Sequence, residues 1–469
     1  MNAPGETKRL PFRVKLGYGM AELSSSLTWT LVAVCFLVFL IDVVGLQPAF
    51  AGFVLMVGKL WDAITDPLLG VVSDRLKTRW GRRRPFLLSV AVPYGVITWL
   101  LFSDFGLTDT LTKVYFIIAI ILYNTAATIL DVPYMSLAAE MTQDYDQRTA
   151  LFSYRAVFSQ IASIIASAVP WSLAPFLAEL LGGEERTGWS AMTAIFGVLA
   201  IIPILWTWNA TRGYELYPER TTVSLKDVIS GPLKNRTFLY TMGVYTTASM
   251  IIGAVGTVME MYMKHYMGFT GTQQTLAFLF LFACTILWIP VISKVSASYG
   301  KRESFIVFFG LWIVVQAVGV SLLKPLMVIP FYILMVLASA GVVTITLIGM
   351  SMIPDAVEVD EFKSGQRREG IHVGVLWFFR KLGIAVVIQL LGLILTWIGY
   401  DGTKTGQSPE TISAIRALFI LGPTVLMLIS IVFAYLMPMT RTRHAALKEA
   451  IRLKSEGKPW DESSIRDVL

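Results

Sequence analysis

Three observations predict an all-α membrane protein with about twelve transmembrane helices. First, 55% of the 469 residues are hydrophobic and only 15% are charged, which is unlike a soluble domain. Second, apolar runs long enough to cross a hydrocarbon layer of about 30 Å recur along the whole chain. Third, basic residues gather in alternate connections between these runs, as they do in multi-pass membrane proteins.

The apolar runs give the approximate positions of the spans. We expect them at 16–42, 49–73, 86–104, 113–139, 149–177, 189–209, 237–263, 274–297, 304–323, 326–353, 371–399 and 412–438. No Ala-x-Ala-like cleavage site follows the first run, so it is expected to be retained as a span.

Charge distribution predicts the orientation. Basic residues such as Arg13, Arg83 and Arg302 crowd one set of connections, whereas the opposite set holds few, such as Lys113 and Lys404. Because Lys and Arg stay preferentially on the cytoplasmic side, both termini should be cytoplasmic in a bacterial inner membrane. The net charge of +7 then follows from topology, and no nucleic-acid partner is expected.

The cysteines and histidines indicate neither a disulfide framework nor a zinc site. Both cysteines, Cys35 and Cys284, lie in apolar spans, where a thiol behaves as a small hydrophobe. The three histidines are scattered and lack metal-ligand spacing. No phosphate-binding Gly-rich loop of the ATPase type is present, so neither an ATP-driven pump nor a cofactor-dependent enzyme is expected.

An internal repeat predicts two halves. "RWGRRRPF" and "SYGKRESF" place Gly81 and Gly300 219 positions apart, and the same offset relates Arg148 to Arg367. The predicted organisation is a six-helix bundle at 1–210, a cytoplasmic linker at 211–235, a second six-helix bundle at 236–438 and a short basic tail at 439–469. Two such parallel halves are typical of the major facilitator fold, in which the substrate site lies between them.

Two carboxylates interrupt the second span. Asp62 and Asp66 are four residues apart, so they share one helix face with roughly 6 Å between their Cβ atoms. An ionised side chain at bilayer depth costs about 2.5–3.5 kcal/mol. Mutual repulsion adds roughly 3 kcal/mol at an effective dielectric of about 20. We therefore expect a positive species to join them, either a sodium ion bound by oxygen ligands or a proton.

A third carboxylate and a hydroxyl extend this cluster. Asp131 lies in the fourth span, with Thr128 three residues earlier on the same helix face. Asp62, Asp66, Thr128 and Asp131 can together form one oxygen cage for Na⁺ or H⁺. The alternative is structural: the aspartates pair with basic residues and hold helices together, the candidates being Lys59, Arg155 and Lys381.

Several motifs together resemble the glycoside-pentoside-hexuronide:cation symporters of the melibiose permease type, within the major facilitator superfamily. They are "KLWDAITDPLLGVVSDR", "RWGRRRPF", "ILDVPYMSL", "IPDAVEVDEFKSGQRREG" and "FFRKLG". The resemblance implies a sodium- or proton-coupled carrier for a sugar, glycoside or hexuronide. It also implies that Asp62, Asp66, Thr128 and Asp131 bind the cation, that Lys381 lies close to them, and that Arg155 lies near the solute and Asp131.

The first span departs from this pattern. Members of the melibiose permease type carry an adjacent Lys-Asp pair there, and the matching positions are Ser25 and Ser26. Glu22, one turn earlier, offers another acid for a hydroxylated ligand, whereas small residues such as these serines also favour close helix packing. Trp377 is the aromatic candidate for stacking on a sugar ring, and packing is its structural alternative.

Charged residues at the predicted cytoplasmic ends are candidates for a gate. Ion pairs among them would break and reform as the halves rock, although positive-inside topology explains the basic members equally well. The candidate gate residues are Asp74, Arg75, Arg82, Arg83, Asp360 and Arg367.

We expect alternating access, in which cation and solute binding strengthen each other by linkage. The expected partners are a small-molecule solute, a monovalent cation and the bilayer, with a monomeric chain. One alternative is a sodium-coupled lysophospholipid carrier of the same superfamily. The other is a non-transporting membrane protein, which would need a nucleophile-base pair or a large soluble domain.

Overall fold

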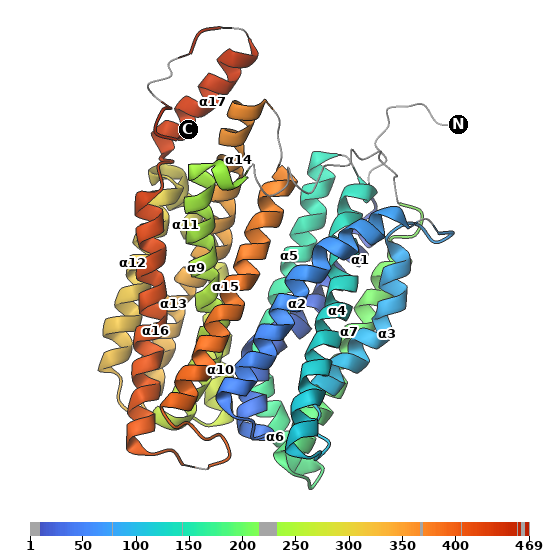
Figure 1. Ribbon diagram of the computed structural model, residues 1–469, viewed down its shortest axis with the longest axis vertical. Helices are drawn as coiled ribbons and strands as arrows, with labels where there is room; N and C mark the ends of the chain where they lie inside the picture. The colour runs from blue at the N-terminus through green and yellow to red at the C-terminus, as the bar shows by residue number, and fades with distance from the viewer. Residues whose placement is uncertain are drawn as a thin grey trace. The chain divides into compact units, whose positions relative to one another are not determined.

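The computed structural model describes residues 10–76, 78–142, 144–214, 232–365, 369–404, 406–456, 458–460 and 465–468. In these residues the secondary structure is helical, apart from one isolated bridge between Thr78 and Gly81 (Figure 1). Twelve helical stretches in the described part of the chain are long and apolar enough to cross a membrane. The predicted helical membrane class and number of spans are thereby confirmed.

The chain divides into two compact units, which are described separately. Unit 1 comprises Met1–Arg220, Thr270–Leu279 and Ile388–Gln407, and unit 2 comprises Thr221–Phe269, Phe280–Val387 and Ser408–Leu469. Two helices contribute residues to both units: α10 (Gly271–Ala283) and α15 (Glu369–Trp397). The predicted division into bundles at 1–210 and 236–438 stays a prediction, and most of the predicted linker lies outside the described residues.

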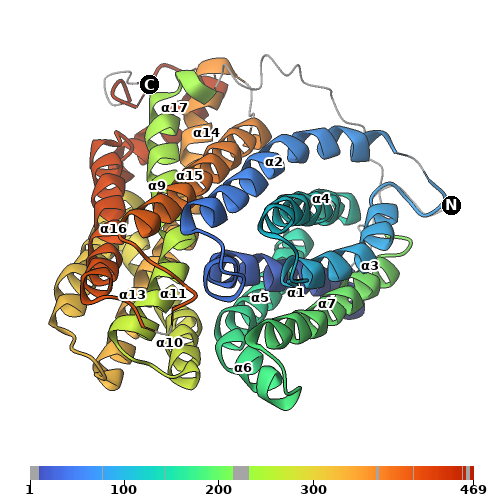
Figure 2. The same cartoon turned by 60° about the horizontal axis from the view of Figure 1, so that its bottom comes forward.

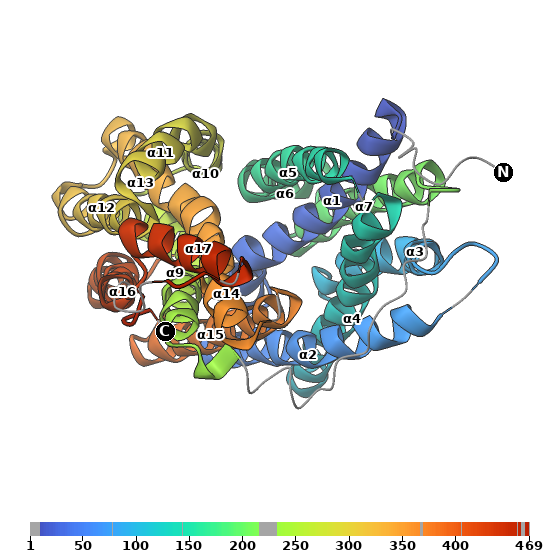
Figure 3. The same ribbon diagram turned by 90° about the horizontal axis from the view of Figure 1, so that it is seen from above.

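In unit 1, α1 packs against α5 and α7, and α3 packs against α7 and α4 (Figure 3). The outer pairs are α2 with α4 and α6 with α7. The helices are α1 (Phe12–Leu31), η1 (Val32–Phe36), η2 (Phe39–Val43), α2 (Pro48–Arg75), α3 (Arg84–Leu101), α4 (Asp109–Met141), α5 (Tyr145–Ala168), α6 (Pro170–Leu180) and α7 (Glu185–Ala210).

Small residues bring the helices of unit 1 close together. A Cβ atom on Gly95 of α3 would lie 2.5 Å from the carbonyl oxygen of Gly197 in α7, so only glycine fits this crossing. Buried aromatic rings fill the wider spaces between helices. The ring centres of Phe36 and Phe102, for example, are 5.2 Å apart. In a bilayer the hydrophobic effect does not drive helices together, because the lipid tails are themselves apolar. Helix association then depends on close packing of this kind.

In unit 2, α9 packs against α16 and α14 (Figure 2). Helix α12 packs against α13 and α16. The helices are η3 (Pro232–Lys234), α9 (Arg236–Met261), η4 (Tyr262–Tyr266), α11 (Thr285–Tyr299), α12 (Lys301–Ile313), η5 (Val314–Gly319), η6 (Val320–Leu322), α13 (Val328–Thr344), η7 (Ile345–Gly349), α14 (Met350–Ser364), α16 (Pro409–Leu436) and α17 (Arg441–Ser455).

Three boundaries differ from the expected spans. The fifth span ends at Ala168 and α6 begins at Pro170, because proline lacks the amide hydrogen that would continue the helix. The tenth span continues through η7 and α14 to Ser364, so its acidic residues lie on a helix rather than in a loop. The basic tail contains α17, whose buried face includes Leu447 and Ala450.

Candidate functional site

Asp62, Asp66 and Thr128 meet where α2 packs against α4. The Thr128 hydroxyl oxygen lies 3.2 Å from Asp62 Oδ1 and 3.1 Å from Asp66 Oδ1. Thr65 is a further neighbour, with its hydroxyl 3.3 Å from that of Thr128. The structure therefore brings together three of the four predicted cation residues by direct contact.

Helical spacing explains why these residues face each other. Gly58 allows close approach, since a Cβ there would lie 2.7 Å from Asn124 Nδ2 of α4. One turn later, Trp61 Nε1 donates to Thr125 Oγ1 at 2.9 Å. The aspartates and Thr128 follow on the same two faces, because positions three and four apart in a helix lie side by side.

The geometry favours a positive species between the two carboxylates. Thr128 is 3% exposed, and its hydroxyl has one hydrogen, so it donates to only one carboxylate at a time. Two like charges about 6 Å apart repel by roughly 3 kcal/mol at an effective dielectric of about 20. A proton shared within the group relieves this repulsion, and so does a small hard cation ligated by the three oxygens.

Asp131 belongs to a neighbouring polar group on α1, α4 and α5. Its Oδ1 accepts a hydrogen bond of 2.7 Å from Ser25 Oγ of α1. Glu22, Arg155 and Asp62 all lie within electrostatic range of its carboxyl. In the described residues, no group of three or more His, Cys, Asp or Glu side chains has the arrangement of a metal site. The cage that includes Asp131 thus stays a prediction.

Glu22 and Arg155 form an ion pair in the same region. Arg155 Nε donates to Glu22 Oε2, and Ser26 Oγ donates to Glu22 Oε1 at 2.9 Å. The guanidinium also lies over the ring of Tyr134, 5.3 Å from its centre. Glu22, Ser25, Ser26 and Arg155, all predicted from the sequence, therefore lie in one network with Asp131.

Two members of this network were missed by the sequence analysis. The hydroxyl oxygens of Ser159 and Ser26 are 2.7 Å apart and share a hydrogen bond. The ring of Tyr18 stacks on that of Tyr134, with the ring centres 4.8 Å apart. Ser159 lies one turn after Arg155, so polar spacing along the fifth span was a usable signal. Tyr18 offered none, because an aromatic residue in an apolar span usually packs.

The other candidates from the eleventh span lie in unit 2. Trp377 is half-buried on α15, and the guanidinium of Arg380 lies 4.7 Å from its ring centre. Lys381 follows on the same helix. Lys59, one of the possible structural partners of the aspartates, lies 6.0 Å from the ring centre of Trp29 in unit 1. The roles of Trp377 and Lys381 stay predictions, and structural pairing of the aspartates stays open.

Arg83, a predicted gate residue, is fully buried in unit 1. Its Nε is 2.9 Å from Glu140 Oε1 on α4, and its Nη1 is 2.5 Å from Ser73 Oγ on α2. Neighbouring Arg84 donates to the carbonyl oxygen of Trp208 at 2.9 Å. Glu140 was missed because its apolar surroundings in "SLAAEM" gave no sign of a partner.

The structure describes some of the remaining gate candidates but not others. Arg82 is half-buried beside Arg83, and Asp360 is buried on α14. Asp74 and Arg75 lie in the last turn of α2, but their side chains are outside the described part of the chain, as is all of Arg367.

Comparison with known proteins identifies the family of this chain. Residues 17–441 match the family described as "MFS/sugar transport protein". The chain belongs to this family. The match spans both units, so the carboxylates of α2 and α4 and the acidic α14 all lie within it.

Curated relatives of this family member are named symporters or carriers. An uncharacterised symporter of Synechocystis is 26% identical, covering 96% of this chain and 98% of the relative. A glucuronide carrier protein homolog of Escherichia coli is 25% identical, covering 92% and 94%. A sodium-dependent lysophosphatidylcholine symporter of Xenopus tropicalis is 22% identical, covering 89% and 86%. These names agree with the glycoside-pentoside-hexuronide:cation symporters and support cation-coupled symport.

A solved structure shows the same fold. A bacterial homolog of the lysosomal transporter Spinster, in an inward-facing and unoccupied conformation, superimposes with a TM-score of 0.65 at 13% identity. The alignment covers 96% of this chain and 99% of that chain. The predicted major facilitator fold is thereby confirmed, and the chain is a multi-pass membrane transport protein.

Proposed function

We propose that this protein is a secondary active symporter that couples inward movement of Na⁺ or H⁺ to uptake of a sugar or glycoside by alternating access. The observation that carries the proposal is the Thr128 hydroxyl lying 3.2 Å and 3.1 Å from the carboxylates of Asp62 and Asp66. A transported cation bound by these three oxygens would offset the repulsion between the two acids.

The cation is a substrate in this proposal and no resident cofactor is required. Asp62, Asp66 and Thr128 supply its first oxygen ligands, and Asp131 joins them from the next turn of α4. Cation binding lowers the negative charge that Asp131 experiences from Asp62. Solute and cation therefore strengthen each other's binding, and the coupling is reciprocal by linkage.

The proposed solute site comprises the network of unit 1 formed by Glu22, Ser25, Ser26 and Arg155. In unit 2, Lys381 and Trp377 of α15 stay predicted solute or coupling residues. The acid of Glu22 and the serine hydroxyls suit a ligand rich in hydroxyl groups. Arg155 already has a counter-charge in Glu22, so its guanidinium is less suited to balance a carboxylate on the solute. An uncharged sugar or glycoside thus fits this network better than a hexuronide.

Transport requires a gate at each end, and the predicted cytoplasmic gate comprises Asp74, Arg75, Arg82, Arg83, Asp360 and Arg367. The distribution of basic residues supports a plasma-membrane protein with both termini in the cytoplasm. The proposed transporter acts as a monomer. A non-transporting role gains no support from the family.

Uptake into proteoliposomes tests the proposal. A panel of neutral sugars, glycosides and hexuronides is offered under an imposed Na⁺ gradient and, separately, an imposed pH gradient. Asp66→Asn should abolish gradient-driven uptake while the protein still inserts. Unchanged active uptake by Asp66→Asn would reject its role in ion binding.

Thr128 provides a matched pair of variants for the same assay. Thr128→Ser keeps the hydroxyl and should retain coupled uptake. Thr128→Val keeps the shape but removes the oxygen, and uptake at subsaturating cation should fall about tenfold, the worth of one ligand contact. Equal loss in both variants would indicate a packing role.

A lysophospholipid carrier is the second candidate function. The relative that favours it is the Xenopus tropicalis symporter, which matches nine-tenths of this chain at 22% identity. Adding lysophosphatidylcholine to the solute panel separates the two. Sodium-driven uptake of that lipid, with no sugar or glycoside transported, would replace the sugar assignment.

A further inference from the structure

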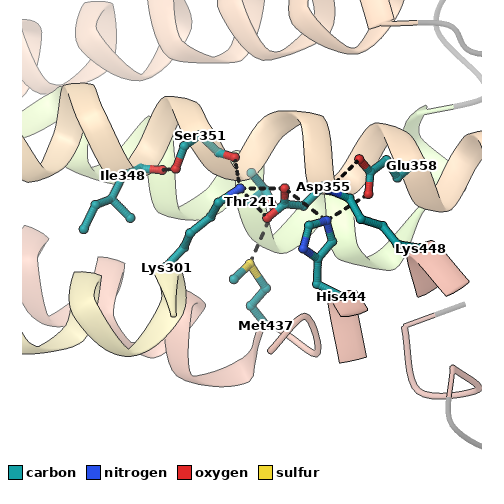
Figure 4. Close-up of polar contacts among 9 residues, drawn as sticks. All are labelled: Thr241, Lys301, Ile348, Ser351, Asp355, Glu358, Met437, His444 and Lys448. Carbon is teal, nitrogen blue, oxygen red and sulfur yellow. Dashed lines mark hydrogen bonds and ion pairs between the residues drawn. The ribbon is translucent and has the colours of Figure 1, made fainter. Parts of the chain in front are cut away.

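The tail helix α17 is held against α14 by a histidine between two carboxylates. His444 Nε2 lies 2.8 Å from Glu358 Oε2 and 3.5 Å from Asp355 Oδ1 (Figure 4). These three side chains are only 21%, 14% and 11% exposed, so water screens their charges weakly. Asp355 and Glu358 are three residues apart and therefore share the face of α14 that α17 covers.

Basic groups from two further positions flank the histidine. Lys301, at the start of α12, lies 2.6 Å from Asp355 Oδ1 and 2.7 Å from the carbonyl oxygen of Ser351. Lys448 of α17 is 4.0 Å from Glu358 but 61% exposed, so its charge is largely screened. Lys301 therefore balances Asp355, and of the two basic residues of α17 beside Glu358, His444 lies nearer to the carboxylate than Lys448 does.

The same end of unit 2 encloses a small cavity of about 110 Å³ lined by His444, Asp355, Lys301, Arg302 and Arg441. Arg302 donates to the carbonyl oxygen of Tyr435 and Arg441 to that of Ser298. Both arginines are thus directed to backbone oxygens rather than to Asp355 or Glu358. A polar cavity of this size is large enough to hold water beside His444.

We propose that Asp355, Glu358 and His444 form a regulatory proton-binding site that fastens α17 to α14. Ionised carboxylates only accept hydrogen bonds, and a neutral imidazole has one N–H to share between them. A protonated ring turns both contacts into charge-assisted interactions, which are about twice as strong as neutral hydrogen bonds. Histidine changes charge between about pH 5 and pH 8, so cytoplasmic acidification tightens the contact and alkalinisation loosens it.

The rest of the tail limits the movement. Lys454 Nζ donates to the carbonyl oxygen of Phe362 at 2.6 Å, and the ring of Trp460 lies 5.8 Å from that of Phe362. Near the end of the chain, Thr237 of α9 donates to the carbonyl oxygen of Val468 at 3.1 Å. None of these contacts involves a group that titrates near neutrality. Loss of the proton therefore releases the first turns of α17 while the segment stays tethered.

Thiol labelling measures this release and does not depend on any transported solute. In full-length protein with Cys35→Ala and Cys284→Ala, a hydrophilic maleimide probes Ala450→Cys, at a position 3% exposed on the buried face of α17. Ala445→Cys, at an exposed position on the same helix, corrects for the pH dependence of thiol reactivity. The ratio of the Ala450→Cys rate to the Ala445→Cys rate should rise about tenfold from pH 6 to pH 8.

Two substitutions at the histidine give opposite expected results. His444→Gln cannot be protonated, so the ratio should stay at its high value at every pH. His444→Lys is permanently charged, so the ratio should stay low. A ratio that is constant in the parent protein, or that still depends on pH in His444→Gln, would overturn the proposal. Should His444→Gln fail to elute as a single species, Glu358→Gln removes the closer carboxylate and should make the rise between pH 6 and pH 8 smaller than in the parent protein. An undiminished rise in Glu358→Gln would overturn the proposal.

Discussion

Arg83 and Glu140 show how single charged residues are accommodated inside the bundle. Their side chains are 1% and 0% exposed and lie 2.9 Å apart, with Ser73 as a second partner of the guanidinium. Among the residues that the structure describes, Glu140 Oε2 has no hydrogen-bond partner, so the carboxylate depends on Arg83 for compensation. Removing one partner leaves an uncompensated buried charge, which is the costly outcome for such a pair.

Arg83→Gln should therefore destabilise the protein by about 3–5 kcal/mol, and Glu140→Gln should do the same. The double variant Arg83→Gln/Glu140→Gln should lose less than the sum, because it leaves no lone charge. Equilibrium unfolding by denaturant in detergent measures the free energy of unfolding of the parent protein, both single variants and the double variant. Strict additivity of the two single effects would contradict the pairing.

Among the helices, the closest approaches occur at glycines. Gly52 of α2 faces the end of α15 within unit 1, and a Cβ there would lie 3.0 Å from the carbonyl oxygen of Ile388 and 3.4 Å from the Cα of Gly392. Nearby, the amide of Ala49 donates to Thr396 Oγ1 at 2.9 Å. Small residues on both helices let the backbones pack at this crossing.

Gly52→Val should force these helices apart and destabilise the protein by about 1–3 kcal/mol, the usual result of overpacking. Gly310 of α12 is the matched control, because a Cβ there would meet no atom within 4 Å. Gly310→Ala should be neutral or stabilise by up to about 1 kcal/mol through helix propensity. Thermal unfolding of the purified variants measures both, and a neutral Gly52→Val would show that the crossing is not tight.

For the whole molecule, the distribution of Lys and Arg predicts its orientation in the membrane. In a cysteine-free background, Trp460→Cys should react with an impermeant maleimide in inside-out vesicles but not in right-side-out vesicles. Lys404→Cys, in an exposed part of the connection between α15 and α16, should show the opposite pattern. Labelling of both positions from the same side would refute the predicted topology.

Sequence reasoning worked best where the physical signal is local. The number of spans, the helical class and the polar positions in spans one, two, four and five follow from hydrophobicity and helical spacing. Placing Asp62 and Asp66 on one face required only their separation by four residues. The pairing of both with Thr128 agrees with the predicted cluster because α2 packs against α4.

Partners that come from distant segments required the tertiary structure. Nothing in the sequence near Glu140 indicates Arg83, and the neutral tract around Glu22 does not reveal Arg155 as its partner. Likewise, α17 read as a basic tail until its packing placed His444 between Asp355 and Glu358. The amino-acid sequence by itself determined that the chain spans a membrane and which residues carry charge, because transfer energy depends on local composition. Which charges meet was decided only by helix packing, because that depends on the shapes of faces far apart in the chain.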